Sequence, residues 1–116
     1  TYNLYFMRYL SMNKIIQNLI AFREERNWKQ FHTPENLAKS ISIEAGELLE
    51  CYQWSYENID RNKVKEELAD VMIYCLYLAE YYKFDIQEII SEKITKNEEK
   101  YTISDSKNNC KKYTDF

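Results

Sequence analysis

The chain has 116 residues, which is enough for one domain with a modest core. Charged residues make up 30% of it and aromatic residues 16%, with one glycine and one proline, so a fold rich in tight turns is disfavoured and an all-α fold is indicated. The net charge of −3 disfavours a protein that binds a nucleic-acid polymer by neutralising phosphates, although bound metal ions would still allow an anionic substrate.

The three cysteines show no metal-ligand spacing, and we expect them to be free thiols in a reducing compartment. The opening segment lacks the basic and long apolar regions of a secretion signal. The longest apolar run, residues 71–79, is too short to span a bilayer. We therefore expect a soluble, cytoplasmic protein with no membrane partner.

Residues 1–11 are aromatic-rich without a clear period and are predicted to be an N-terminal extension. Apolar residues at helical spacing predict a first helix over 12–27, and residues 28–32 interrupt that pattern. Thr33 and Pro34 then form a helix start, with Thr as N-cap and Pro at the first helical position, and the second helix is predicted to run to about Trp54.

Asp60 can cap a third helix over 61–82, which becomes apolar nearly all round. A small monomer can hardly cover such a helix, so a homo-oligomer is expected. Asp85 begins a fourth helix over 86–99. The predicted organisation is a helical domain over 12–101, a four-helix bundle, followed by a polar, lysine-rich C-terminal tail over 102–116.

Two pairs of acids stand out, Glu44 with Glu47 and Glu67 with Asp70, each three residues apart on a predicted helix and beside apolar residues. Carboxylates in apolar surroundings are costly unless a cation compensates them, and hard divalent cations take oxygen ligands. The pattern predicts a Mg²⁺ site, with Mn²⁺ as a possible substitute, and four carboxylates would balance two ions. Ordinary charged helix faces are the simpler interpretation.

A di-iron carboxylate bundle would also place acids on facing helices, but it needs Glu-x-x-His repeats. The single histidine, His32, has no acid three residues before it, so this alternative is weak.

Two further groups are candidates for contact with a nucleotide. Aromatic rings near a metal–phosphate site could enclose a nucleobase, and the candidates are Trp28, Phe31, His32, Trp54 and Tyr74. A polar stripe on the last helix could contact phosphates, and it consists of Lys93, Asn97 and Tyr101. Core packing for the first group and a solvated face for the second are the simpler interpretations.

Four segments together resemble a known family: Trp28–Leu37 (WKQFHTPENL), Glu44–Leu48 (EAGEL), Tyr52–Trp54 (YQW) and Glu66–Val71 (EELADV). They resemble the MazG-like all-α nucleoside triphosphate pyrophosphohydrolases, in particular the dCTP pyrophosphatase branch. The resemblance runs from about Phe22 to Phe116.

That resemblance implies Mg²⁺-dependent hydrolysis of a (deoxy)nucleoside triphosphate, dCTP or a related dNTP, to the monophosphate and pyrophosphate, a nucleotide-pool house-cleaning activity. It implies that Glu44, Glu47, Glu67 and Asp70 bind two or more Mg²⁺ ions. It also implies that the five aromatic candidates surround base and sugar, and that the polar stripe lies on the phosphate side. Glu47 is our candidate for the residue that orients or deprotonates the attacking water.

The family forms intertwined dimers, often paired into tetramers, so the resemblance also implies self-association as a homodimer or homotetramer. Two departures leave base preference open: the first-helix histidine of dCTP-preferring members falls on Leu19, and the connector after Trp54 is short. The alternatives are a non-catalytic helical nucleotide-binding or protein-interaction module and a nucleotide-binding regulator that hydrolyses slowly.

Overall fold

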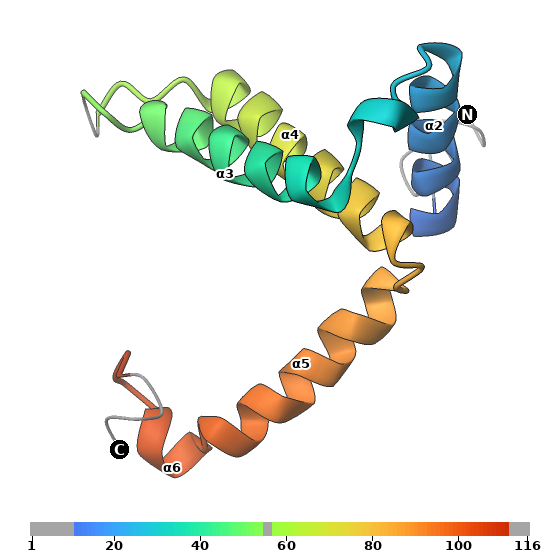
Figure 1. The fold of residues 1–116 in the computed structure, drawn as a ribbon. Helices are drawn as coiled ribbons and strands as arrows, with labels where there is room; N and C mark the ends of the chain where they lie inside the picture. The colour runs from blue at the N-terminus through green and yellow to red at the C-terminus, as the bar shows by residue number, and fades with distance from the viewer. Residues whose placement is uncertain (1–10, 55–56, 112–116) are drawn as a thin grey trace, which may run out of the picture. The chain divides into compact units, whose positions relative to one another are not determined.

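The computed structural model describes residues 11–54 and 57–111, and within these ranges it contains helices and no strands, as predicted (Figure 1). The elements are α2 (Met12–Glu25), a 3₁₀ turn η1 (Lys29–Phe31), α3 (Pro34–Glu50), α4 (Arg61–Tyr81), α5 (Ile86–Lys100) and α6 (Ile103–Ser106). The chain divides into two compact units, residues 1–83 and 84–116. The extension predicted for 1–11 lies outside the described residues, except for Ser11.

The predicted helix starts are confirmed by their caps. The Thr33 hydroxyl accepts a hydrogen bond from the Asn36 N–H at 3.2 Å, and the Asp85 carboxylate accepts one from the Glu88 N–H at 3.0 Å. Asp60 likewise accepts from two N–H groups at the start of α4. Each side chain satisfies backbone donors that a helix start leaves without a partner, so these local signals set the starts of three helices.

The predicted end of the second helix at about Trp54 is wrong, because α3 ends at Glu50. Beyond it, the N–H groups of Cys51, Tyr52 and Gln53 bond to carbonyls three residues back, at 3.0–3.2 Å, so the chain tightens into turns. The predicted tail also contains an ordered element, since Thr102 caps the short helix α6 through the Asp105 N–H.

In the first unit, α3 and α4 lie side by side, and α2 packs against α4 (Figure 1). Two polar links fix α2. The Tyr77 hydroxyl of α4 donates to the Leu19 carbonyl at 2.7 Å, and the Arg23 guanidinium pairs with the Glu80 carboxylate of α4 at 3.1 Å. Arg23 is 5% exposed, so this ion pair belongs to the small core along with Leu37 and Tyr77.

Much apolar surface stays open to solvent. On α4, Leu68 and Met72 are about half exposed, and on α5 so are Ile90 and Ile94. The third helix therefore has uncovered apolar side chains, as its sequence predicted. None of the described helices is long and apolar enough to cross a membrane.

Candidate active site

Carboxylates from α3 and α4 converge. Glu44 of α3 and Glu67 and Asp70 of α4 each offer an oxygen, and these oxygens all lie within 4.8 Å of one another. Glu67 and Asp70 share a face of α4 because they are three residues apart. The packing of α3 along α4 brings Glu44 to that face. We call these three residues the acidic cluster.

Negative charge on the acidic cluster is energetically unfavourable. Burial raises the pKa of the Glu44 carboxyl from 4.5 to about 7, and a side-chain hydrogen bond with Glu47 adds to this increase. The charges of Glu47, Asp70 and Glu67 raise it further. The pKa of Glu67 is raised by burial first and then by Glu47 and Asp70, and Lys63 opposes this change. Without a cation, Glu44 is therefore substantially protonated near neutral pH.

Two oxygens of the acidic cluster are compatible with a bound cation. The Oε2 atoms of Glu44 and Glu67 are buried and have no hydrogen-bond partner among the described residues. Buried polar atoms in native proteins are usually satisfied, so unpartnered ones call for a ligand or solvent. An all-carboxylate donor set suits a hard divalent ion such as Mg²⁺ or Mn²⁺.

Glu47 occupies a different position from the other three acids. It lies one turn after Glu44 on α3, its side chain is exposed, and it interacts with both Glu44 and Glu67. It is not part of the group whose oxygens lie within 4.8 Å of one another. A carboxylate at the solvent edge of a metal site is placed to accept a proton from a water molecule entering from bulk solvent.

An aromatic pocket of about 480 Å³ adjoins the acidic cluster, and Asp70 belongs to both. Its walls come from α2, from the segment around η1 and from α4. The residues that line it are Ile15, Asn18, Leu19, Phe22, Trp28, His32, Asp70, Ile73, Tyr74 and Tyr77. We call this the aromatic pocket.

The predicted ring residues Trp28, His32 and Tyr74 all line the aromatic pocket. The ring centroid of His32 lies 4.8 Å from that of Tyr77 and 6.4 Å from that of Tyr74. Burial, followed by the charge of Arg23, lowers the pKa of His32, so its imidazole is neutral at pH 7. Its buried Nδ1 atom has no hydrogen-bond partner among the described residues.

Tyr74 lines the aromatic pocket and is also close enough to the acids for their charges to affect its hydroxyl. Burial raises the pKa of its hydroxyl, and the charges of Glu44, Asp70 and Glu47 raise it further. The phenol therefore stays protonated at neutral pH and can donate a hydrogen bond.

Other predicted site residues lie apart from the aromatic pocket. Phe31 is 60% exposed and Trp54 87% exposed, and neither lines it. Lys93 and Asn97 line a separate pocket of about 550 Å³ on α5, together with three isoleucines. Tyr101 caps the end of α5. These last three residues belong to the second unit, residues 84–116.

The sequence interpretation missed five residues of the pocket wall: Ile15, Asn18, Phe22, Ile73 and Tyr77. A signal existed for the α2 residues, because Ile15, Leu19 and Phe22 are spaced at i, i+4 and i+7 and share one face, with Asn18 at its edge. Periodicity alone does not indicate which surface of the protein this helix face covers.

Comparison with known proteins is consistent with this geometry. Residues 39–116 match the MazG-like family. The chain is 35% identical over 104 residues to dCTP pyrophosphatase 1 of Rattus norvegicus and 33% identical to that of Homo sapiens, with 82% of this chain covered. It spans about 61% of the length of these curated relatives.

A solved structure is also similar, that of a pyrophosphatase from Archaeoglobus fulgidus. It is 40% identical in sequence, with a TM-score of 0.74, and the match covers 78% of this chain and 92% of the other. The resemblance drawn from the sequence is therefore confirmed. By its sequence match and its fold, the chain belongs to the MazG-like family.

Proposed function

We propose that this protein hydrolyses a (deoxy)nucleoside triphosphate, dCTP or a related dNTP, to the monophosphate and pyrophosphate. The observation that carries the proposal is that Asp70 belongs both to the acidic cluster and to the aromatic pocket. A ligand with an anionic chain and a flat aromatic end matches that juxtaposition, because the rings can stack on a base while the acids hold cations beside the phosphates. The names of the relatives point to the same substrate class.

The residues that would hold Mg²⁺ are Glu44, Glu67 and Asp70, with Glu47 as a fourth ligand at the solvent edge. When bound, such ions neutralise phosphate charge and lower the pKa of a coordinated water. Their double positive charges would also remove the repulsion that raises the pKa of Glu44 and Glu67.

In this proposal the Glu47 carboxylate orients the attacking water and takes its proton. The water oxygen bonds to the α-phosphorus while the bond from that phosphorus to the bridging oxygen breaks, so pyrophosphate leaves and the monophosphate stays in the pocket. Trp28, His32 and Tyr74 hold base and sugar, and the neutral imidazole of His32 adds no positive charge there. Exclusion of water by these rings strengthens the electrostatic interactions at the phosphates.

The other predicted contacts remain part of the proposal. Lys93, Asn97 and Tyr101 would meet the phosphates, and Phe31 and Trp54 would close over the nucleoside. The exposure of Phe31 and Trp54 leaves both side chains accessible to a ligand or to another subunit.

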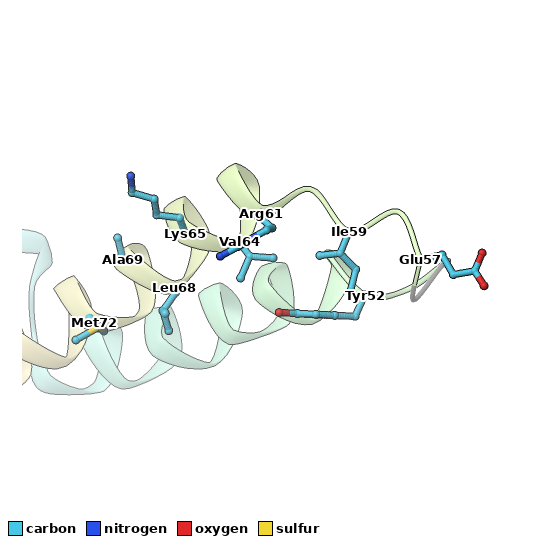
Figure 2. A pocket seen from close by; sticks show the side chains of 9 residues that line it. All are labelled: Tyr52, Glu57, Ile59, Arg61, Val64, Lys65, Leu68, Ala69 and Met72. Carbon is cyan, nitrogen blue, oxygen red and sulfur yellow. The ribbon is translucent and has the colours of Figure 1, made fainter.

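We also propose that the protein self-associates as a dimer or tetramer. A pocket of about 670 Å³ lies along α4 and the connector before it. Figure 2 shows the side chains that line it, among which Tyr52, Ile59 and Val64 continue the exposed stripe of Leu68 and Met72. Only Leu37, Tyr77 and Ala79 are buried apolar residues among those described, which is a small core for a domain of this length. Burial of this stripe against a second copy would enlarge the apolar core.

The experiment is pyrophosphate release from a panel of dNTPs and NTPs with Mg²⁺, for the wild type, Asp70→Asn and Glu66→Gln. Asp70→Asn removes a carboxylate of the acidic cluster, and we expect release to fall by about 100-fold or more. Glu66 is an exposed acid elsewhere on α4, so its variant should keep wild-type activity. No release by the folded wild type, or equal activity of wild type and Asp70→Asn, would contradict the proposal.

A further inference from the structure

The wall that α2 gives to the aromatic pocket carries one amide. Ile15, Leu19 and Phe22 form its apolar part, and Asn18 lies beside them with an exposed side chain. Leu19 is aliphatic, and its carbonyl already accepts a hydrogen bond from the Tyr77 hydroxyl. Any polar contact between α2 and the edge of a base therefore depends on Asn18.

Two of the other polar side chains of the pocket are committed elsewhere. Asp70 belongs to the acidic cluster, and the Tyr77 hydroxyl donates to Leu19 at 2.7 Å. The Tyr74 hydroxyl lies within the field of three carboxylates, and the Nδ1 atom of His32 is buried. Asn18 makes no side-chain hydrogen bond to any residue in the described part of the chain, so its amide is free for a ligand.

A primary amide carries a donor and an acceptor side by side, and it can therefore pair with two adjacent groups on the edge of a base. Cytosine presents an amine donor at position 4 beside the N3 acceptor, whereas uracil presents an oxygen acceptor beside an N3–H donor. An amide anchored by the protein would match one of these and leave the other unpaired, which gives strong rejection. An unanchored amide can rotate by 180° and match both.

We propose that Asn18 is the residue of the aromatic pocket that contacts the edge of the base and that it accepts the edges of cytosine and uracil alike. This inference rests on the proposed function, because it takes the aromatic pocket as the base site. Under this inference dCTP and dUTP, which differ at position 4 of the ring, are both substrates.

The test compares kcat/KM for dCTP and dUTP, which share phosphates, sugar and ring size. The wild type should use both within about tenfold of each other. Asn18→Leu should lower kcat/KM for both by about 5- to 150-fold, mainly through KM, because it removes a bidentate contact. Asn18→Asp keeps only acceptors, and cytosine and uracil each present one donor beside one acceptor, so this variant should lower kcat/KM for both and keep their ratio within about threefold of the wild-type ratio.

Gln17→Leu is the matched control. It replaces an exposed amide next to Asn18 that does not line the aromatic pocket, and it should leave both rates and their ratio unchanged. Equal behaviour of the Leu variants at positions 17 and 18, wild-type rates in Asn18→Asp for both nucleotides, or more than 100-fold discrimination by the wild type would overturn the inference.

A binding readout separates this inference from the proposed function. Titration of dCMP and dUMP against intrinsic tryptophan fluorescence uses Trp28 in the pocket wall and needs no turnover. Binding of both nucleotides that Asn18→Leu weakens, without pyrophosphate release, would overturn the proposed function alone. Hydrolysis by the wild type that responds equally to both Leu variants would overturn the role of Asn18 alone, and the absence of both binding and hydrolysis would overturn both.

Discussion

Replacing Glu44 by Gln should make the metal-free protein more stable while removing its response to Mg²⁺. Burial and the neighbouring acids raise the pKa of Glu44 from 4.5 to about 7, so the folded chain binds this proton more tightly than the unfolded chain does. Above pH 7 the carboxylate is charged in both states, and its charge destabilises the folded state. As the pH falls from 7 to 4.5 the folded state takes up the proton and that destabilisation disappears.

The size of the effect follows from the difference between the two pKa values. At about 1.4 kcal/mol per pH unit, a rise from 4.5 to about 7 corresponds to an upper limit of about 3.5 kcal/mol. Glu44 is only half-buried, and solvent and salt screen its neighbours, so we expect about 1–2 kcal/mol at low ionic strength. For a domain of this size, that is a rise in Tm of roughly 4–16 °C at pH 8.

The assay is urea unfolding of wild type and Glu44→Gln at equal protomer concentration, in EDTA at pH 8 and pH 5 and with Mg²⁺ at pH 8. We expect the variant to be the more stable protein in EDTA at pH 8 and the difference to shrink at pH 5. Mg²⁺ at 100 times its Kd should stabilise the wild type by about 2.7 kcal/mol and the variant far less. Glu66→Gln is the control, and lower stability of Glu44→Gln in EDTA at pH 8 would refute the reasoning.

Two further predictions concern the scaffold. Arg23→Met should lower the free energy of unfolding by about 3 kcal/mol, because it leaves the Glu80 carboxylate, 14% exposed, with only Lys83 as its partner. In a double-mutant cycle, Arg23→Met with Glu80→Met should cost less than the sum of the single changes, and strict additivity would show that the pair is not coupled. Gly46→Ala should raise stability by about 1 kcal/mol in a thermal melt, since no described atom lies within 4 Å of the added Cβ, and a loss would reveal close packing by a ligand or a second copy.

The parts of the fold set by local chemistry could be predicted from the sequence. Thr33, Asp60 and Asp85 each bond to nearby backbone N–H groups, so the signal and its effect lie within four residues. The end of α3 could not be predicted, because the apolar period continues to Tyr52 while the backbone has already changed to bonds three residues back. Apolar periodicity indicates which residues favour burial, but it does not indicate where the helix ends.

The same distinction applies to the candidate site, part of which could be predicted from local sequence and part of which could not. The sequence alone shows that Asp70 is a charged residue within an apolar run. The spacing of Glu67 and Asp70 places them on the same face of a helix. Whether a ring lines the aromatic pocket depends instead on which elements pack together. Trp28 lines the pocket and Phe31 does not, although only three residues separate them, because η1 turns Phe31 towards solvent.

The arrangement also places the acidic cluster and the α2 wall of the aromatic pocket on different helices. The acidic cluster belongs to α3 and α4, whereas the α2 wall is held to α4 by the Arg23–Glu80 ion pair and the hydrogen bond from Tyr77 to Leu19. A substitution on the pocket face of α2 therefore changes the wall of the aromatic pocket without replacing a carboxylate. Under the proposed function, base preference can therefore change through α2 while the carboxylates of the acidic cluster are kept.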